Sequence, residues 1–96
     1  MRNSRIERNT GETRISLSLN LDGEGNFSGS CGVGFMDHML HAFCVHGGFD
    51  LELQMTGDLE VDCHHSIEDL GIVLGKAFSQ ALGDKKGIGR YGSFYI

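Results

Sequence analysis

Two stretches of the chain alternate between apolar and polar residues, which is the pattern of half-buried β-strands. The first runs from Arg14 to Leu21 and the second from Phe49 to Met55. A weaker pattern over residues 4–10 predicts another strand, paired with the first. Residues 22–26, with the sequence Asp-Gly-Glu-Gly-Asn, follow the first strand and have the composition of a hairpin turn.

Two other segments have apolar residues at three- and four-residue steps, the spacing of one face of an α-helix. Residues 34–46 contain no helix breaker, and Gly47-Gly48 is a typical helix stop. The stronger pattern covers residues 64–82, and residues 88–96 are expected to form a last short strand. The apolar stripes comprise Phe35, Met39, Ala42, Phe43 and His46 in the first helix and Ile67, Leu70, Leu74, Ala77, Phe78 and Ala81 in the second.

The order of these elements is β-β-α-β-α, with a further strand in the tail, and it indicates an α+β fold. We expect a small, mainly antiparallel or mixed sheet of about four strands, with two helices packed on one face. The 96 residues form one domain with a modest core. The other face of the sheet must then meet solvent or a partner.

Composition and charge narrow the range of functions. Thirteen acidic and eight basic residues give a net charge of −5, which opposes binding to nucleic acid. No apolar run approaches the roughly 20 residues of a membrane span, and no signal-peptide core follows the first residues. Three cysteines, an odd number, suit a reducing compartment. We therefore expect a cytoplasmic protein with neither nucleic acid nor membrane as a partner.

Histidines and a carboxylate at the starts of the two expected helices carry the most chemical information. His64 and Glu68 are four residues apart and share a helix face, so they can bind one metal ion. His65 points about 100° away from His64, so the spacing predicts two metal positions. His38, from the other helix, is a natural further ligand. Imidazole and carboxylate without a thiolate cluster indicate Mn, Fe, Co or Zn.

Each candidate residue also has a simpler interpretation. A polar helix start is often merely solvated, so His64 and Glu68 need not bind a metal. Glu12 lies beside a strand start and is accounted for as surface charge, and Arg90 either binds an anion or is simply exposed. His46 is interpreted as a helix-end residue. Cys63 as a nucleophile lacks an activating arrangement.

Seven short motifs nevertheless occur in order along nearly the whole chain, and together they resemble the imidazoleglycerol-phosphate dehydratase family, in its N-terminal half. The combination of DHML with a later HHxxED is specific. Cys63 and the pair Ser30-Cys31 depart from the usual pattern, but neither is a ligand position. The motifs are RNTGET at 8–13, LDG at 21–23, FMDHML at 35–40, HGGFDL at 46–51, GDL at 57–59, HHSIED at 64–69 and ALGD at 81–84.

The resemblance implies a fold of two similar half-domains in tandem, of which residues 1–96 would be one, with the second half absent. It implies a hydro-lyase of histidine biosynthesis that converts imidazoleglycerol phosphate to imidazoleacetol phosphate. The expected cofactor is Mn²⁺, two ions per complete site.

The family also implies roles for individual residues. His38 and His65 would bind one manganese ion, and His64 and Glu68 the other, which agrees with the two positions inferred from helix geometry. Glu12 and Glu68 would be catalytic, with Glu12 also at the substrate. Arg90 would contact the substrate phosphate, and the segment of His46 would line the pocket, so that these residues and the metal ligands form the substrate site.

Two classes of function remain open for the isolated chain. As half of a dehydratase, it is expected to be weakly active or inactive alone, because each metal lacks ligands from the second half. Self-pairing would partly restore them, as a dimer of half-domains or in the large cage-like assembly of the family. The alternative is a non-catalytic half-domain that binds metal and self-assembles. A metal-dependent hydrolase is a weaker interpretation, because no third in-chain ligand completes an open site.

Overall fold

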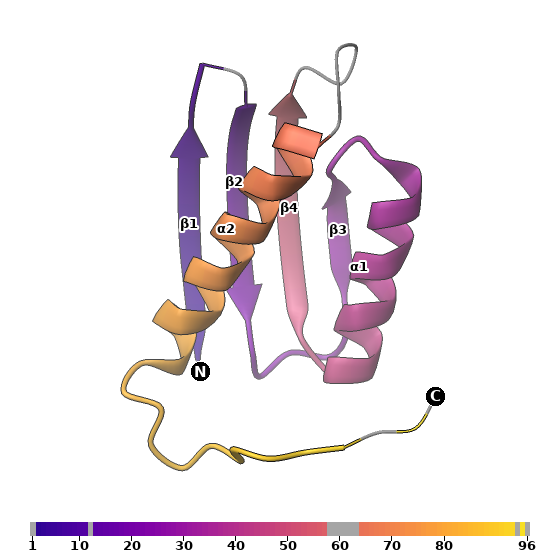
Figure 1. Cartoon of the computed structure of the whole chain (residues 1–96). Helices are drawn as coiled ribbons and strands as arrows, with labels where there is room; N and C mark the ends of the chain where they lie inside the picture. The colour runs from indigo at the N-terminus through magenta and orange to yellow at the C-terminus, as the bar shows by residue number, and fades with distance from the viewer. Residues whose placement is uncertain (1, 12, 58–63, 94, 96) are drawn as a thin grey trace.

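The computed structural model describes residues 2–11, 13–57, 64–93 and 95. Four strands and two helices follow one another in these residues (Figure 1). Their bounds are β1 Asn3–Asn9, β2 Thr13–Asn20, β3 Phe27–Ser30, α1 Gly34–Gly47, β4 Asp50–Gly57 and α2 His64–Leu82. The expected strands around residues 4–10, 14–21 and 49–55 and both expected helices are therefore confirmed.

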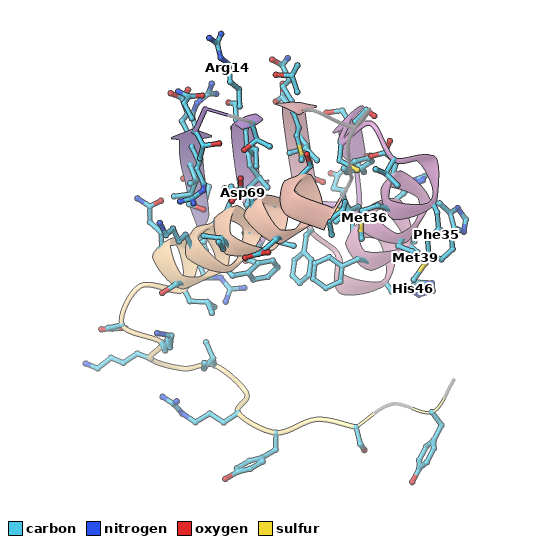
Figure 2. The ribbon with its side chains drawn as sticks, turned by 45° about the horizontal axis from the view of Figure 1, so that its top comes forward. Arg14, Phe35, Met36, Met39, His46 and Asp69 are labelled. Carbon is cyan, nitrogen blue, oxygen red and sulfur yellow. The ribbon has the colours of Figure 1, made fainter. Side chains whose placement is uncertain are left out.

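The four strands form one mixed sheet in the order β1-β2-β4-β3. β2 is antiparallel to both of its neighbours, β1 and β4, whereas β3 is parallel to β4. Both helices lie on the same side of this sheet, with α2 across β1 and β2 and α1 beside β3 (Figures 1 and 2). The predicted α+β class, with a small mixed sheet and two helices on one face, is confirmed.

The core lies between the sheet and the helices. Every second side chain of β2 and β4 points into it. Each large apolar side chain buried there contributes roughly 1.5–3 kcal/mol relative to an exposed one. The buried apolar residues are Ile15, Leu17, Leu19, Leu21, Cys31, Leu40, Cys44, Leu51, Leu53, Leu70, Val73, Ala77 and Ala81.

The first helix differs from the second in what it buries. Only Leu40 and Cys44 of α1 are buried. Much of the stripe that predicted the helix lies at the surface: Phe35 is 74 % exposed and Met39 48 %, whereas Phe43 packs against the rings of Phe49 and Phe78. Figure 2 shows Phe35 and Met39 on the side of α1 that faces away from the sheet. The helix therefore has one apolar face on the core, and it also has apolar side chains, Phe35 and Met39, at the surface.

The expected hairpin after β2 is wrong, because β2 and β3 are not neighbours in the sheet. The chain passes the end of β4, and β3 pairs with β4 on its far side. Asp50 holds this connection, since its Oδ1 accepts the backbone N–H of Glu24 at 2.9 Å and of Asn26 at 3.0 Å. Those hydrogen bonds lower the pKa of Asp50 below its ordinary value. The tight hairpin instead joins β1 to β2.

The expected last strand at residues 88–96 is also wrong for the described part of that segment. Residues 88–93 and 95 have no strand structure, and the tail leads away from the sheet (Figure 1). Tyr91 is 99 % exposed, so this part of the tail does not pack against the sheet. Among the described residues, no helix is long and apolar enough to cross a membrane.

Candidate functional site

The topology brings both helix starts to one end of the sheet. β1, β3 and β4 run in the same direction, so their last residues, Asn9, Ser30 and Gly57, lie at this end. β2 starts there, because Thr13 pairs with Gly57. α1 follows β3 and α2 follows β4, so both begin at the same end (Figure 1). We call this region the helix-start end.

Most predicted site residues belong to the helix-start end by their position in the chain. His38 lies in the first turns of α1 and Glu68 in the first turns of α2, and both are exposed. His64 and His65 are the first two residues of α2. Their side chains, and the whole of Glu12, lie outside the described residues. The neighbours of Glu12, however, form the β1–β2 turn at this end.

Two predicted site residues lie elsewhere within one copy of the chain. His46 is in the last turn of α1, at the opposite end from His38. Arg90 is in the tail beyond α2, is exposed, and donates from Nη2 to the carbonyl oxygen of Lys85 at 3.3 Å. The structure of one copy therefore does not bring His46 and Arg90 to the helix-start end, and their roles stay predictions.

Among the described residues, no three His, Cys, Asp or Glu side chains lie close enough together to hold a metal ion. Of the predicted ligands, only His38 and Glu68 have described side chains. The fit to a metal thus rests on donor chemistry and on placement. Imidazole and carboxylate donors are compatible with Mn, Fe, Co or Zn, and four such residues occur on the two helix starts at one end of the sheet.

Asp37 fixes the start of α1 beside His38. Its Oδ2 accepts the Ser30 hydroxyl at 2.6 Å, and its Oδ1 accepts the backbone N–H of Cys31 at 2.8 Å. Partial burial opposes ionisation, but the hydrogen bonds from Ser30 and Cys31 prevail and lower the pKa of Asp37. The carboxylate therefore ties the first turn of α1 to the end of β3.

Asp69 fixes the start of α2 in the same way, but inside the core. It is 2 % exposed, and its Oδ2 accepts the hydroxyl of Thr13 at 2.6 Å. Arg8 Nε lies 3.4 Å from Asp69 Oδ1. The sequence analysis gave Asp69 no role beyond its place in the HHSIED motif. A signal was available, because Asp69 lies four residues before Val73 and eight before Ala77, on the buried face of α2.

The described cysteines do not favour thiol chemistry. Burial raises the pKa of the Cys31 and Cys44 thiols above their ordinary value. A raised pKa leaves less thiolate, which is the nucleophilic form. Cys63, the cysteine considered as a nucleophile, lies outside the described residues.

Two shallow hollows lie over the uncovered face of the sheet, with volumes of about 490 and 280 Å³. Polar side chains such as Ser18 and Glu52 line the larger one, and Glu7 and Arg14 line the smaller. Neither hollow is lined by a predicted site residue.

Comparison with known proteins identifies the fold and the family of the chain. The fold resembles the crystal structure of imidazoleglycerol-phosphate dehydratase from Staphylococcus aureus, with a TM-score of 0.80, 34 % sequence identity, and coverage of 98 % of this chain and 50 % of that one. The chain thus has the fold of part of a dehydratase. A sequence model described as imidazoleglycerol-phosphate dehydratase matches residues 31–96, and the chain belongs to that family.

Relatives of the same name are similar over the full chain. The dehydratase of Carboxydothermus hydrogenoformans is 58 % identical over 96 residues, which are 99 % of this chain and 50 % of the relative. That of Pelobacter propionicus is 60 % identical over 95 residues, covering 99 % of this chain and 49 % of the relative. The chain therefore spans about half the length of the curated relatives it matches.

Proposed function

We propose that this chain forms one half of a manganese-dependent site that removes water from imidazoleglycerol phosphate in histidine biosynthesis. The product is imidazoleacetol phosphate, and the proposed location is the cytoplasm. One observation carries the proposal: a sheet of this topology brings the starts of α1 and α2, with their histidines and Glu68, to the same end. Membership of the dehydratase family supports the choice of substrate.

The donor set fits two Mn²⁺ ions, one held by His38 and His65 and the other by His64 and Glu68. Bound to the substrate imidazole, such cations favour the deprotonated ring, which is the chemistry that they supply. In this proposal Glu12 is the base. Its carboxylate takes a proton from the middle carbon of the glycerol chain, while hydroxide leaves the carbon attached to the ring. The resulting enol becomes the ketone by moving its proton to carbon.

In this proposal the substrate is positioned by Arg90 and His46, which one copy of the chain does not bring to the helix-start end. Arg90 is suited to the phosphate, because a guanidinium donates two parallel hydrogen bonds to phosphate oxygens. Since Arg90 and His46 lie away from the helix-start end of their own chain, we propose that they act at the site of a neighbouring copy.

Self-association is the second part of the proposal. Phe35 and Met39 form an exposed apolar stripe on α1, which we call the outer stripe. A soluble protein seldom leaves such a stripe uncovered, and a two-fold dimer would cover it with the same stripe of a second copy. The second copy would also supply metal ligands that one chain lacks. The isolated monomer is then weakly active or inactive.

The alternative is a metal-binding, self-assembling module without catalysis. It would use the same proposed metal ligands, His38, His64, His65 and Glu68, without turning over a substrate. The two functions differ in whether product forms once the site is completed.

The test measures turnover of imidazoleglycerol phosphate with Mn²⁺ and the mass of the chain by light scattering. The chain is assayed alone and mixed with the part of the Carboxydothermus relative that it does not match. Dehydration that requires the added part or a dimer supports the proposal, and His38→Ala should abolish it. His41→Ala, an exposed histidine on the same helix, is the matched control.

Two results would contradict the proposal. Assembly with Mn²⁺ but no turnover, even with the added part, favours the module. Full turnover by a proven monomer would show that the site is complete in one chain.

A further inference from the structure

We infer that Asp69 is a positioning residue, which fixes the start of α2, and with it His64, His65 and Glu68, relative to the β1–β2 turn. The inference rests on the proposed function, because it concerns the residues proposed to hold the metal. It adds a residue that touches neither metal nor substrate in that proposal.

The first argument is the contact itself. The hydrogen bond from the Thr13 hydroxyl to Asp69 Oδ2 is 2.6 Å long and buried, and it joins residues 56 positions apart in the chain. Hydrogen bonds to an ionised acceptor are the short and strong ones. Arg8 Nε, 3.4 Å from the other oxygen, adds a positive charge from β1. Figure 2 shows Asp69 on the side of α2 that faces the sheet.

The second argument is what a carboxylate does there that an apolar side chain would not. Val73 and Ala77 lie on the same buried face of α2. Their hydrophobic contacts have no preferred direction. Burying a charged group is costly, so for stability alone a well-packed apolar residue would serve as well or better. A hydrogen bond, in contrast, has a preferred length and angle. It therefore restricts sliding and rotation of α2 on the sheet, which apolar packing tolerates.

The third argument is where the other end of the hydrogen bond is fixed. Thr13 closes the β1–β2 turn, since its backbone N–H donates to Thr10 Oγ1 at 2.9 Å and its carbonyl accepts from Thr10 N–H at 2.8 Å. It also pairs with Gly57, the last residue of β4. Thr13 therefore contacts both the last residue of β4 and Asp69 near the start of α2.

The proposed ligands of α2 lie close to Asp69 on the same helix, so its position affects theirs. His65 precedes Asp69 by four residues, about one turn of the helix, and Glu68 is its direct neighbour. Metal ligands are sensitive to the groups that orient them, and loss of such groups typically weakens binding by about 10–100-fold. The same order of loss is expected when Asp69 is released.

The experiment compares four variants with the unaltered chain: Thr13→Val, Thr13→Ser, Val73→Ala and Asp69→Asn. Thr13→Val removes the hydroxyl, Thr13→Ser retains it, and Val73→Ala weakens the same face of α2 without touching the cluster. For each, the affinity for Mn²⁺ is measured from the electron paramagnetic resonance of the free ion. Stability is measured by urea unfolding, and amide hydrogen exchange is followed at residues 64–70.

We expect Thr13→Val to bind Mn²⁺ about tenfold more weakly and to exchange faster at the start of α2. Thr13→Ser should behave as the unaltered chain does. Val73→Ala should lose stability but keep its Mn²⁺ affinity. Asp69→Asn, a second way to release the anchor, should resemble Thr13→Val.

Two results would overturn the inference: unaltered Mn²⁺ affinity in both Thr13→Val and Asp69→Asn, or an equal loss in Val73→Ala. If the unaltered chain, alone and completed, binds no Mn²⁺, the proposed function fails instead. The anchor is then judged by hydrogen exchange. Faster exchange confined to the start of α2 in Thr13→Val supports it, and a uniform increase contradicts it.

Discussion

The two helices lie on the same face of one sheet, yet they depend on the rest of the chain to different degrees. α2 buries Leu70, Val73, Ala77 and Ala81 and is tied to the sheet through a buried carboxylate. α1 buries only Leu40 and Cys44. Its attachment at Asp37 lies nearer the surface, and its apolar side chains Phe35 and Met39 are exposed. The comparison shows that α2 buries more of its apolar residues against its own chain than α1 does.

The proposed site takes ligands from the starts of both helices, so it depends on both. His64, His65 and Glu68 belong to the helix that the chain fixes by itself. His38 belongs to the helix whose outer stripe is uncovered. Completion of the site and covering of α1 are therefore expected to occur together.

The largest expected effect is on the core side of α2. Leu70→Ala should lower the free energy of unfolding by roughly 2–5 kcal/mol, because it removes a buried side chain and leaves a cavity. Leu70 is 3 % exposed. Urea unfolding measures the change, and Met39→Ala on the outer stripe is the comparison, measured at a concentration where the chain is monomeric. Equal losses in the two variants would show that the helices do not differ.

The next effect concerns the anchor of α2. Thr13→Val should cost about 1–3 kcal/mol, since it leaves a buried carboxylate without its hydroxyl donor. Urea unfolding again gives the value, with Thr13→Ser as the control that retains the hydrogen bond. A Thr13→Val variant as stable as the unaltered chain would mean that the hydrogen bond is weak in solution.

The outer stripe should govern association and contribute little to monomer stability. Replacing Phe35 and Met39 by Ser should leave the chain monomeric at concentrations where the unaltered chain dimerises, because the apolar contact is lost. Light scattering over a concentration series measures this. Gln54→Ser, on the uncovered face of the sheet, is a matched surface change. The stripe is not the interface if the Phe35/Met39 variant still dimerises.

The smallest expected effect is the pH dependence contributed by Asp37. Its pKa is lower in the folded chain than in the unfolded one, so its ionised form stabilises the fold. That contribution is complete above the unfolded value of about 3.9 and is lost as the pH falls through the lower folded value.

Asp37→Asn should therefore reduce the acid sensitivity of stability slightly, with Asp84→Asn, an exposed carboxylate beyond α2, as the control. Urea unfolding between pH 3 and 7 follows the change. Asp37→Asn should remove only part of the acid sensitivity of stability, because Asp22 and Asp50 also have lowered pKa values. An unchanged or steeper loss of stability in acid would argue against the hydrogen bonds of Asp37.

Much of the fold could be predicted because β2, β4 and α2 carry strong periodic patterns. β3 could not, since its four residues include one large apolar side chain, Phe27, and a glycine. Gly29 is required by the pairing, because it has a φ of 97° and a Cβ there would collide with the backbone of Leu53 in β4. Such a constraint arises only in the assembled sheet.

For the candidate site, sequence patterns predicted which residues lie on the two helix starts, and the topology placed these starts together. The role of Asp69 was missed, because an acidic residue early in a helix is normally attributed to the helix dipole. The outer stripe of α1 shows a related limit. Periodicity predicts a helix, but it does not tell which of two apolar faces meets the core.

The strand order has a final consequence for how copies of this chain meet. It leaves β1 and β3 as the edge strands, whose unpaired backbone groups are the usual route to aggregation. β1 carries three charged side chains, Arg5, Glu7 and Arg8, and β3 is only four residues long. Charges and short length both discourage the addition of a further strand. The proposed self-association would therefore use the helical layer and not sheet extension, and it could end at a closed dimer.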